Sequence, residues 1–230
     1  MACEKMYVIF DLDDTLYPES EYVLSGFKTV AEYLSISSDM TVEEIYNKLR
    51  SDFEDGVRGK NFDRLLQDTG IDADVENLVH LYRTHTPDIE ITGDSKTCLN
   101  QLSNRWLGIV TDGKATKQKN KIQGLGISDK FDTIYISGEF GPDSGKPSTD
   151  MFDRLISDTR HIPEEMVYVG DNPKKDFVAP NDLGMRSIWV DRPWGEYTEL
   201  EPTTNKESPT ARVEDLTDVP ELIRKWEADL

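Results

Sequence analysis

One segment near the start of the chain, MYVIFDLDDTLYP (6–18), constrains the fold more than any other. Residues 7–10 form a short apolar run of β-branched and aromatic side chains, which predicts a buried strand. Polar side chains follow this run at once: Asp11, Asp13, Asp14 and Thr15. Open α/β sheets bind ligands at the carboxyl ends of their strands, so the acids are expected at a ligand site.

The spacing of these acids has an electrostatic consequence. Asp11 and Asp13 are two residues apart, so both side chains would point the same way if the strand geometry continued. Two like charges about 4 Å apart repel by roughly 4 kcal/mol at an effective dielectric of 20. Such a pair favours a divalent cation or a shared proton. The alternative for an isolated DxD is an acidic loop that caps a helix.

The second half of the chain alternates between strand-like and helix-like patterns. Strands are expected at 106–113, 132–139, 166–172 and 187–190, with helices between them. Strands separated by helices predict parallel βαβ units. The polar stretch 193–210 is expected to be a surface loop. A closing helix follows, with an apolar stripe formed by Leu216, Val219, Leu222, Ile223 and Trp226.

Residues 19–91 have a different character. Apolar residues recur there at helical spacing in four successive segments, and no convincing strand interrupts them. A run of helices after the first strand of an α/β sheet indicates an inserted helical module. The alternative is four helices of the core itself.

Three further segments place polar groups in turns or at strand ends. In TDG, the hydroxyl of Thr111 and the backbone amides of Asp112 and Gly113 would form an anion cradle at a helix start. GKPS presents Lys146 before a proline, and GDNPKKD carries Asp171 and, five residues on, Asp176. Taken singly, these segments also fit a capped turn, a solvated lysine and an Asp-Asn-Pro turn.

Taken together, DLDDT, TDG, GKP and GDNPKKD resemble the four motifs of the haloacid dehalogenase-like (HAD) superfamily, in order and at suitable intervals. The resemblance covers essentially the whole chain, and the helical insert is similar to the C1-type cap. It implies an α/β fold with a doubly wound, parallel-sheet, Rossmann-like core (1–16 and 93–230). An inserted all-helical cap domain would span 17–92.

The resemblance also implies catalytic and metal-binding roles. Asp11 would be the nucleophile that forms an aspartyl-phosphate. Asp13 would protonate the leaving oxygen and then deprotonate the attacking water. Asp11, Asp171 and the backbone carbonyl of Asp13 would hold Mg²⁺.

Further roles concern the phosphoryl group and its surroundings. Lys146 and Thr111, with the amides of Asp112 and Gly113, would stabilise the phosphoryl oxygens. Asp176 would order Lys146 or a metal-bound water. Thr15 would support the first motif.

The implied function is an Mg²⁺-dependent phosphomonoesterase acting on a small phosphorylated metabolite, either a sugar phosphate or a nucleoside monophosphate. Haloacid dehalogenases proper lack an acid at the position of Asp13, because halide leaves without a proton. The alternatives are a phosphomutase of the same superfamily and a non-enzymatic phosphoacceptor signalling domain. In the signalling domain the phosphorylated Asp ends the third strand, whereas the third predicted strand here ends in Ser-Gly-Glu.

Composition limits the partners. A net charge of -19 argues against nucleic-acid and anionic-membrane binding. We find neither an apolar run long enough to span a bilayer nor a signal-peptide pattern, so a cytoplasmic protein is expected. The sequence leaves open whether it is a monomer or a homodimer. Cys3 and Cys98 fit no metal or redox pattern, and the three histidines, His80, His85 and His161, lack zinc-ligand spacing.

Two basic segments have open interpretations. Lys114, Lys117, Lys119 and Lys121 are expected to form a solvated helix face, or to add positive potential beside the site. In the insert, residues 54–62 combine two glycines with Arg58 and Lys60, which are predicted to contact an anionic substrate. The alternative is a surface turn whose cations offset the acids beside them.

Overall fold

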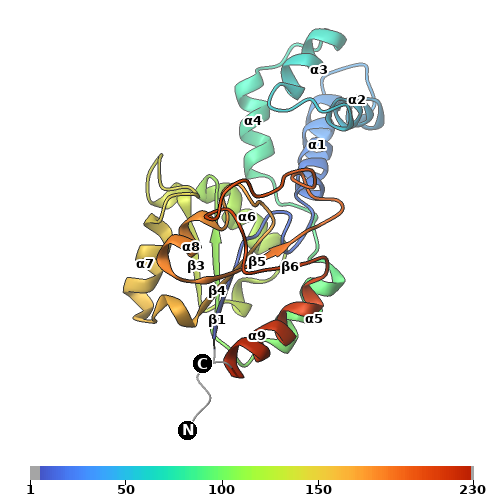
Figure 1. Cartoon of the computed structure of the whole chain (residues 1–230). Helices are drawn as coiled ribbons and strands as arrows, with labels where there is room; N and C mark the ends of the chain where they lie inside the picture. Colours follow the sequence, from blue (N-terminus) through green and yellow to red (C-terminus); the bar gives the residue numbers. More distant parts are fainter. Residues whose placement is uncertain (1–5, 229–230) are drawn as a thin grey trace. The chain divides into compact units, whose positions relative to one another are not determined.

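The structure is a computed structural model that describes residues 6–228, so Cys3 lies outside the described residues. The chain divides into two compact units (Figure 1). One unit is built from the chain up to Glu19 and from Glu90 onward, and the other is Ser20–Ile89. The sequence analysis predicted the inserted unit at residues 17–92.

The first unit contains a parallel sheet in the order β3-β2-β1-β4-β5-β6 (Figure 1). Every described pair of neighbouring strands in it is parallel. The central strands are buried along almost their whole length, which explains their continuous apolar runs. The strands are β1 (Tyr7–Phe10), β2 (Leu107–Thr111), β3 (Thr133–Ile136), β4 (Met166–Gly170), β5 (Arg186–Val190) and β6 (Ala211–Val213).

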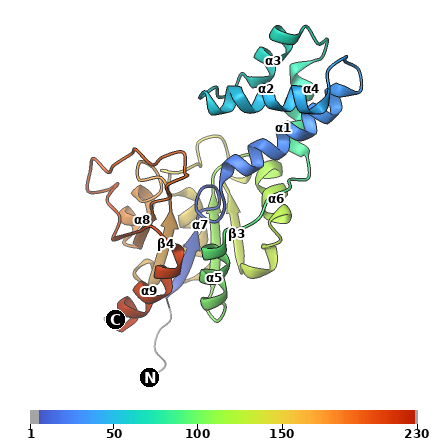
Figure 2. The same cartoon turned by 90° about the vertical axis from the view of Figure 1, so that its right-hand side faces the viewer.

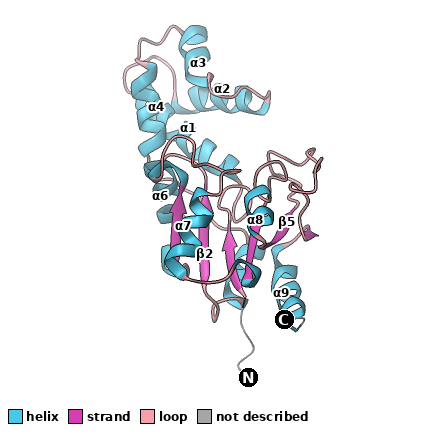
Figure 3. Ribbon diagram, turned by 60° about the vertical axis from the view of Figure 1, so that its left-hand side comes forward, coloured by secondary structure: helices cyan, strands magenta, loops and turns pink. Residues whose placement is uncertain are grey.

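Helices cover both faces of this sheet. In Figure 3, α7 and α8 lie in front of the strands, whereas α5, α6 and α9 lie on the opposite face (Figure 2). This is the arrangement that right-handed crossovers produce when the strand order reverses. It confirms the predicted doubly wound α/β fold. The helices are α5 (Gly93–Gln101), α6 (Ala115–Gly124), α7 (Asp150–Thr159), α8 (Val178–Leu183) and α9 (Val219–Ala228).

The strand order also decides where a ligand site forms. β1 and β4 are hydrogen bonded to each other, and the connections on either side of this pair leave toward opposite faces. A crevice opens at such a reversal, at the carboxyl ends of the strands. The order differs from 2-1-3-4-5, the order of flavodoxin-like signalling folds, so the phosphoacceptor alternative is not supported.

The predicted third strand ends earlier than expected, because Ser137–Glu139 forms a 3-10 turn. The amide of Gly138 donates a hydrogen bond to the carbonyl of Gly113 at 3.0 Å. A Cβ atom on Gly138 would lie 2.5 Å from that carbonyl oxygen, so a glycine is needed for this close approach. The bend therefore fastens the end of β3 to the loop that follows β2.

The sequence analysis missed β6. Its three residues pair with β5 at the sheet edge, with Ile188 opposite Ala211. Three residues are too few to show a recognisable alternation, and the flanking segment is polar. The pairing depends instead on a partner strand more than twenty residues away, where the Thr210 amide donates to the Ser187 carbonyl at 2.9 Å.

The second unit has a hydrophobic core of its own. The four predicted helices are confirmed as α1 (Glu19–Ser35), α2 (Val42–Glu54), α3 (Asn61–Thr69) and α4 (Val75–Thr84). Thr41 starts α2 with a capping box in which its side chain and that of Glu44 bond to each other's backbone amides. That this unit acts as a cap stays a prediction. Buried apolar residues from all four helices form its core: Phe27, Leu34, Ile45, Leu49, Leu65 and Leu78.

Among the described residues, no helix combines the length and the apolar character needed to cross a membrane.

Candidate active site

Three adjacent strands deliver their polar end residues to one edge of the sheet. Asp11 follows β1, Thr111 ends β2 and Asp171 follows β4. Because β1 lies between β2 and β4, these three side chains meet although they are up to 160 residues apart in sequence. They open onto a pocket of about 130 Å³, which is also lined by Asp13, Glu19, Asp112, Gly113, Lys117, Gln118, Lys175 and Tyr197.

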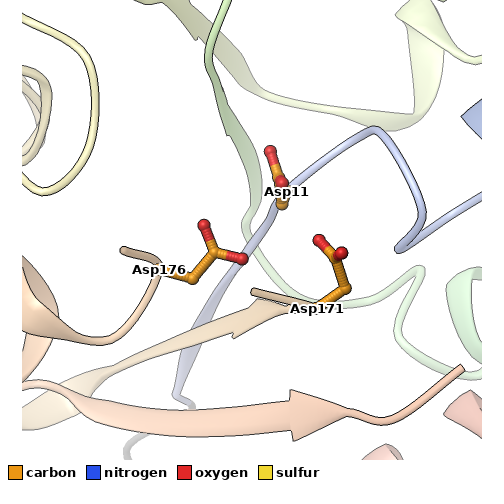
Figure 4. A group of neighbouring side chains, drawn as sticks. All are labelled: Asp11, Asp171 and Asp176. Atoms are coloured by element: carbon orange, nitrogen blue, oxygen red, sulfur yellow. The ribbon is translucent and has the colours of Figure 1, made fainter. Parts of the chain in front are cut away.

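Three buried carboxylates form a group at this edge of the sheet. Asp11, Asp171 and Asp176 each place one oxygen within 4.8 Å of the other two (Figure 4). Asp176 is fixed by the turn after β4, where its Oδ2 accepts a hydrogen bond from the Asn172 amide at 2.8 Å. A Cβ atom on Gly170 would lie 2.6 Å from the same oxygen, so this approach requires a glycine.

Burial makes the negative charge of this group costly. It raises the pKa of Asp11 to about 7, even though Lys146 opposes the shift. Burial, together with Asp176 and Asp11, also raises the pKa of Asp171 well above its usual range. A nearby cation would stabilise the ionised form of these carboxylates and so lower their raised pKa values.

Lys146 is the cation that the protein itself supplies. Its Nζ lies 3.0 Å from Asp11 Oδ1 and 2.8 Å from Asp176 Oδ1, and the side chain is fully buried. Burial would lower the pKa of Lys146, but the two carboxylates hold it well above its usual value. The sequence analysis missed a third contact, a hydrogen bond from Nζ to the Tyr168 hydroxyl at 2.7 Å.

One lysine leaves the carboxylate group with excess negative charge. Within residues 6–228, Asp11 Oδ1 and Asp176 Oδ1 are buried and make no hydrogen bond, although both lie within ion-pair distance of Lys146. A set of hard carboxylate oxygens with free lone pairs fits a divalent cation such as Mg²⁺ or Ca²⁺. The sequence analysis predicted that Asp176 orders Lys146 or a metal-bound water; the structure pairs Asp176 with Lys146 and also places its carboxylate beside those of Asp11 and Asp171.

The carboxylate of Asp13 lies apart from this group. Its Oδ1 accepts hydrogen bonds of 2.6 Å from both the Tyr17 hydroxyl and Lys121 Nζ. Its Oδ2 accepts one of 2.9 Å from Gln118 Nε2. The side chain still lines the pocket. Binding of a metal by the backbone carbonyl of Asp13 stays a prediction.

The loop after β2 departs from the predicted anion cradle in one respect. Thr111 is buried, and its hydroxyl oxygen accepts a hydrogen bond from Gln118 Nε2 at 2.8 Å. The Gly113 amide, expected to be free, donates to the Ser137 hydroxyl at 3.0 Å because β3 bends over this loop. The Asp112 carboxylate accepts a hydrogen bond from the Lys146 amide at 3.0 Å and so fixes the lysine loop.

The remaining residues of the first motif shape its loop. Thr15 Oγ1 reaches Asp171 Oδ1 at 3.5 Å, a long hydrogen bond between the two motifs. Asp14 adopts a left-handed conformation with a φ of 52°. Its carboxylate accepts hydrogen bonds from the amides of Glu19 at 2.8 Å and Glu196 at 2.9 Å, which compensate for this unusual backbone.

The lysine-rich helix is not a solvated face throughout. Lys121 is fully buried between Asp13 and Glu19, and Lys117 also pairs with Glu19, at 2.9 Å. Lys117 and Lys121 are four residues apart and so share one helix face, a signal the sequence did contain. Lys175, which the sequence analysis did not single out, lines the pocket with its Nζ 3.4 Å from Asp112.

The two cations predicted to contact substrate lie in the helical unit. The Arg58 guanidinium donates to the Phe53 carbonyl at 2.7 Å and lies 4.0 Å above the Phe53 ring, so it closes the end of α2. Lys60 is exposed and precedes α3. Contact between substrate and either cation stays a prediction.

Comparisons with known proteins find relatives along nearly the whole chain. The family described as "Haloacid dehalogenase-like hydrolase" matches residues 8–190. Glyceraldehyde 3-phosphate phosphatase of Methanocaldococcus jannaschii is 30% identical over 95% of this chain and 98% of its own length. The enzyme of the same name from Methanopyrus kandleri is 29% identical over 96% and 98%.

A solved structure has the same fold. The hydrolase YfnB of Bacillus subtilis, crystallised with magnesium, superposes with a TM-score of 0.69. The two proteins share 19% sequence identity, and the match covers 96% of this chain and 99% of the other.

Proposed function

Because the chain belongs to the haloacid dehalogenase-like hydrolase family, we propose that it is an Mg²⁺-dependent phosphomonoesterase that forms an aspartyl-phosphate. The observation that carries this proposal is the group of buried carboxylates with Lys146 at the carboxyl ends of β1 and β4. A nucleophile, a general acid and cations for a phosphoryl group all face the same crevice.

The first chemical step uses Asp11 and Asp13. An oxygen of Asp11 attacks phosphorus while the bond from phosphorus to the leaving oxygen breaks. Asp13 gives its proton to that oxygen, so the alcohol leaves neutral and Asp13 remains as a carboxylate.

The second step returns the enzyme to its starting state. The Asp13 carboxylate takes a proton from a water molecule, and the water oxygen attacks phosphorus. The bond between phosphorus and Asp11 breaks, which releases inorganic phosphate and restores both acids. Asp13 lines the pocket, as both of its tasks require.

Asp11, Asp171 and the backbone carbonyl of Asp13 would hold Mg²⁺, with Asp176 beside them. When bound, the ion would offset the charge of the phosphoryl group and of the acids. Lys146, Thr111 and Lys175 would stabilise the phosphoryl oxygens. These local cations are needed, since a net charge of -19 repels an anionic substrate.

Sugar phosphates are the favoured substrate class. Two relatives that match along nearly their whole length are named as phosphatases of glyceraldehyde 3-phosphate. We therefore place short sugar phosphates ahead of nucleoside monophosphates.

A phosphate-release screen tests the proposal, with Mg²⁺ and a panel of sugar phosphates, nucleotides and phosphorylated acids. The Asp11→Asn variant keeps nearly the same volume but loses the nucleophile, so it should release no phosphate. It should also unfold no more easily than the wild type, because an ionised Asp11 is costly at this buried position. Phosphate release by folded Asp11→Asn at the wild-type rate would refute the covalent mechanism. Transfer of phosphate within the substrate, without release, would indicate a mutase.

A further inference from the structure

Lys121 is a buried charged residue with no part in the proposed mechanism. Its side chain is fully buried, and its Nζ contacts Asp13 Oδ1 at 2.6 Å and Glu19 Oε1 at 2.7 Å. Burying a lysine is costly unless it is paired, so the surroundings of this residue must compensate for its charge. Lys121 and Gln118 both donate a hydrogen bond to Asp13, the proposed general acid.

We infer that Gln118 and Lys121 of α6 are positioning residues that hold the Asp13 carboxylate in the orientation needed for proton transfer to the leaving group. The inference rests on the proposed function, because it concerns the same reaction. Neither residue lies in the four motifs from which the site was predicted.

The contacts to Asp13 restrict its rotation. Tyr17 and Lys121 donate to one carboxylate oxygen, and Gln118 donates to the other at 2.9 Å. Donors on both oxygens fix the plane of the carboxylate as well as its position. Three of the carboxylate's roughly four lone-pair sites are thus occupied, and the side chain lines the pocket.

Gln118 links the acid to the phosphate-binding loop. Its amide nitrogen donates to Asp13 Oδ2 and, at 2.8 Å, to the hydroxyl oxygen of Thr111. Asp13 Oδ2 is the acceptor of this bond, so the nitrogen and not the oxygen of the Gln118 amide faces it. Because Thr111 accepts from Gln118, its own hydroxyl proton is directed elsewhere and can serve a phosphoryl oxygen.

The backbone of the TDG loop is shaped around Gln118. Gly113 has a φ of 138°, and a Cβ atom there would lie 3.2 Å from the Gln118 side chain. The glycine therefore allows the amide to reach both partners.

Glu19 anchors the lysine from the other side. Its Oε1 accepts hydrogen bonds from Lys121 and, at 2.9 Å, from Lys117. Burial would raise the pKa of Glu19, but the two lysines lower it to about 2. Once Asp13 has protonated the leaving group and is ionised, it forms a charge-balanced cluster with Glu19, Lys117 and Lys121, in which Lys121 Nζ stays beside Asp13.

The test compares substrates that differ in their need for a general acid. Glycerol 3-phosphate has a poor alkoxide leaving group, whereas p-nitrophenyl phosphate has a good leaving group and needs little protonation. kcat/KM is measured for both with the wild type, Gln118→Met and Lys121→Met. Lys119→Met is the matched control, because it removes the same charge from the same helix at a side chain that is 62% exposed.

We expect the ratio of kcat/KM for glycerol 3-phosphate to that for p-nitrophenyl phosphate to fall about 10-fold to 100-fold in both test variants. In Gln118→Met, kcat/KM should also fall a few-fold for both substrates, because Thr111 loses its hydrogen bond from Gln118. Lys119→Met should keep the wild-type ratio. If these residues had a purely structural role, kcat/KM would fall by the same factor for both substrates and the ratio would not change.

An unchanged ratio in the two test variants would overturn the inference while leaving the proposed function intact. If Lys121→Met does not fold, the ratio measured for Gln118→Met tests the inference. This substitution removes no buried charge, so the variant is expected to fold. If the wild type releases phosphate from neither substrate nor from any other monoester, the proposed function fails and the inference fails with it.

Discussion

We expect the hydroxyl of Tyr168 to contribute to both stability and activity, more than the hydroxyl of a tyrosine in the middle of a sheet usually does. It accepts a hydrogen bond from Lys146 Nζ at 2.7 Å and donates one to the Val110 carbonyl at 3.0 Å. Both contacts are buried, so Tyr168→Phe would leave a charged donor and a carbonyl without this partner. Losing a hydrogen bond to a charged group costs about 1.5–3 kcal/mol, and losing the neutral one about 1 kcal/mol.

The expected loss of unfolding free energy is therefore about 2.5–4 kcal/mol. For a chain of this size, that corresponds to a fall in Tm of about 5–16 °C. Activity should fall as well, because Tyr168 is one of three residues that contact Lys146 Nζ. Without its hydroxyl, only Asp11 and Asp176 hold the lysine in place. A displaced catalytic group can cost up to about 100-fold in rate, so we expect a drop in kcat of about 10-fold to 100-fold.

Tyr135→Phe is the matched control for this change. Tyr135 also lies on the sheet, but its hydroxyl donates at 2.9 Å to Asp158, whose side chain is 40% exposed. Water can replace the lost partner there, so the expected cost is below about 1 kcal/mol. Urea unfolding and phosphate release would be measured for both variants. Equal effects of the two substitutions, or a wild-type kcat for Tyr168→Phe, would refute the reasoning.

Three other outcomes are expected. Treatment with EDTA should abolish phosphate release and added Mg²⁺ should restore it, whereas Ca²⁺ should bind but support little turnover; full activity after EDTA would contradict the metal requirement. Arg58→Ala and Lys60→Ala should each cost about 1–3 kcal/mol in kcat/KM on the preferred substrate but little on acetyl phosphate, and equal losses on both would assign these residues to general architecture. Burial and then Asp94 raise the pKa of Cys98 to about 12, so in a Cys3→Ser background native protein should resist iodoacetamide between pH 7 and 9 and react only when unfolded. Alkylation of the native protein that rises with pH and levels off near pH 8.5 would show an ordinary, accessible thiol.

Sequence patterns alone were sufficient to identify five of the six described strands of the sheet and the four chemical segments. A buried parallel strand must be apolar over several residues, and the residue that follows it must lie at the sheet edge. Asp11, Thr111 and Asp171 could therefore be assigned to one edge before their distances were known. The helices of the insert were equally clear, because amphipathic spacing is a local property.

Short pairings and loop contacts were not predictable in this way. β6 has three residues, too few to show a period, and depends on its pairing with β5. The Gly113 amide was expected to face a phosphate, but the bend at Ser137 engages it. Neither outcome has a signal in the residues themselves, because each depends on a partner that is more than twenty positions away.

The supporting groups of the site were decided by the tertiary structure. Lys121 reads as one of several lysines on a polar helix, yet it is buried against Asp13, which precedes it by 108 residues. Tyr168 reads as an ordinary apolar strand residue, yet its hydroxyl binds Lys146. The sequence identifies which residues can carry charge or donate hydrogen bonds. Burial and pairing are set only when distant segments pack, and they determine which of those residues act on the reacting groups.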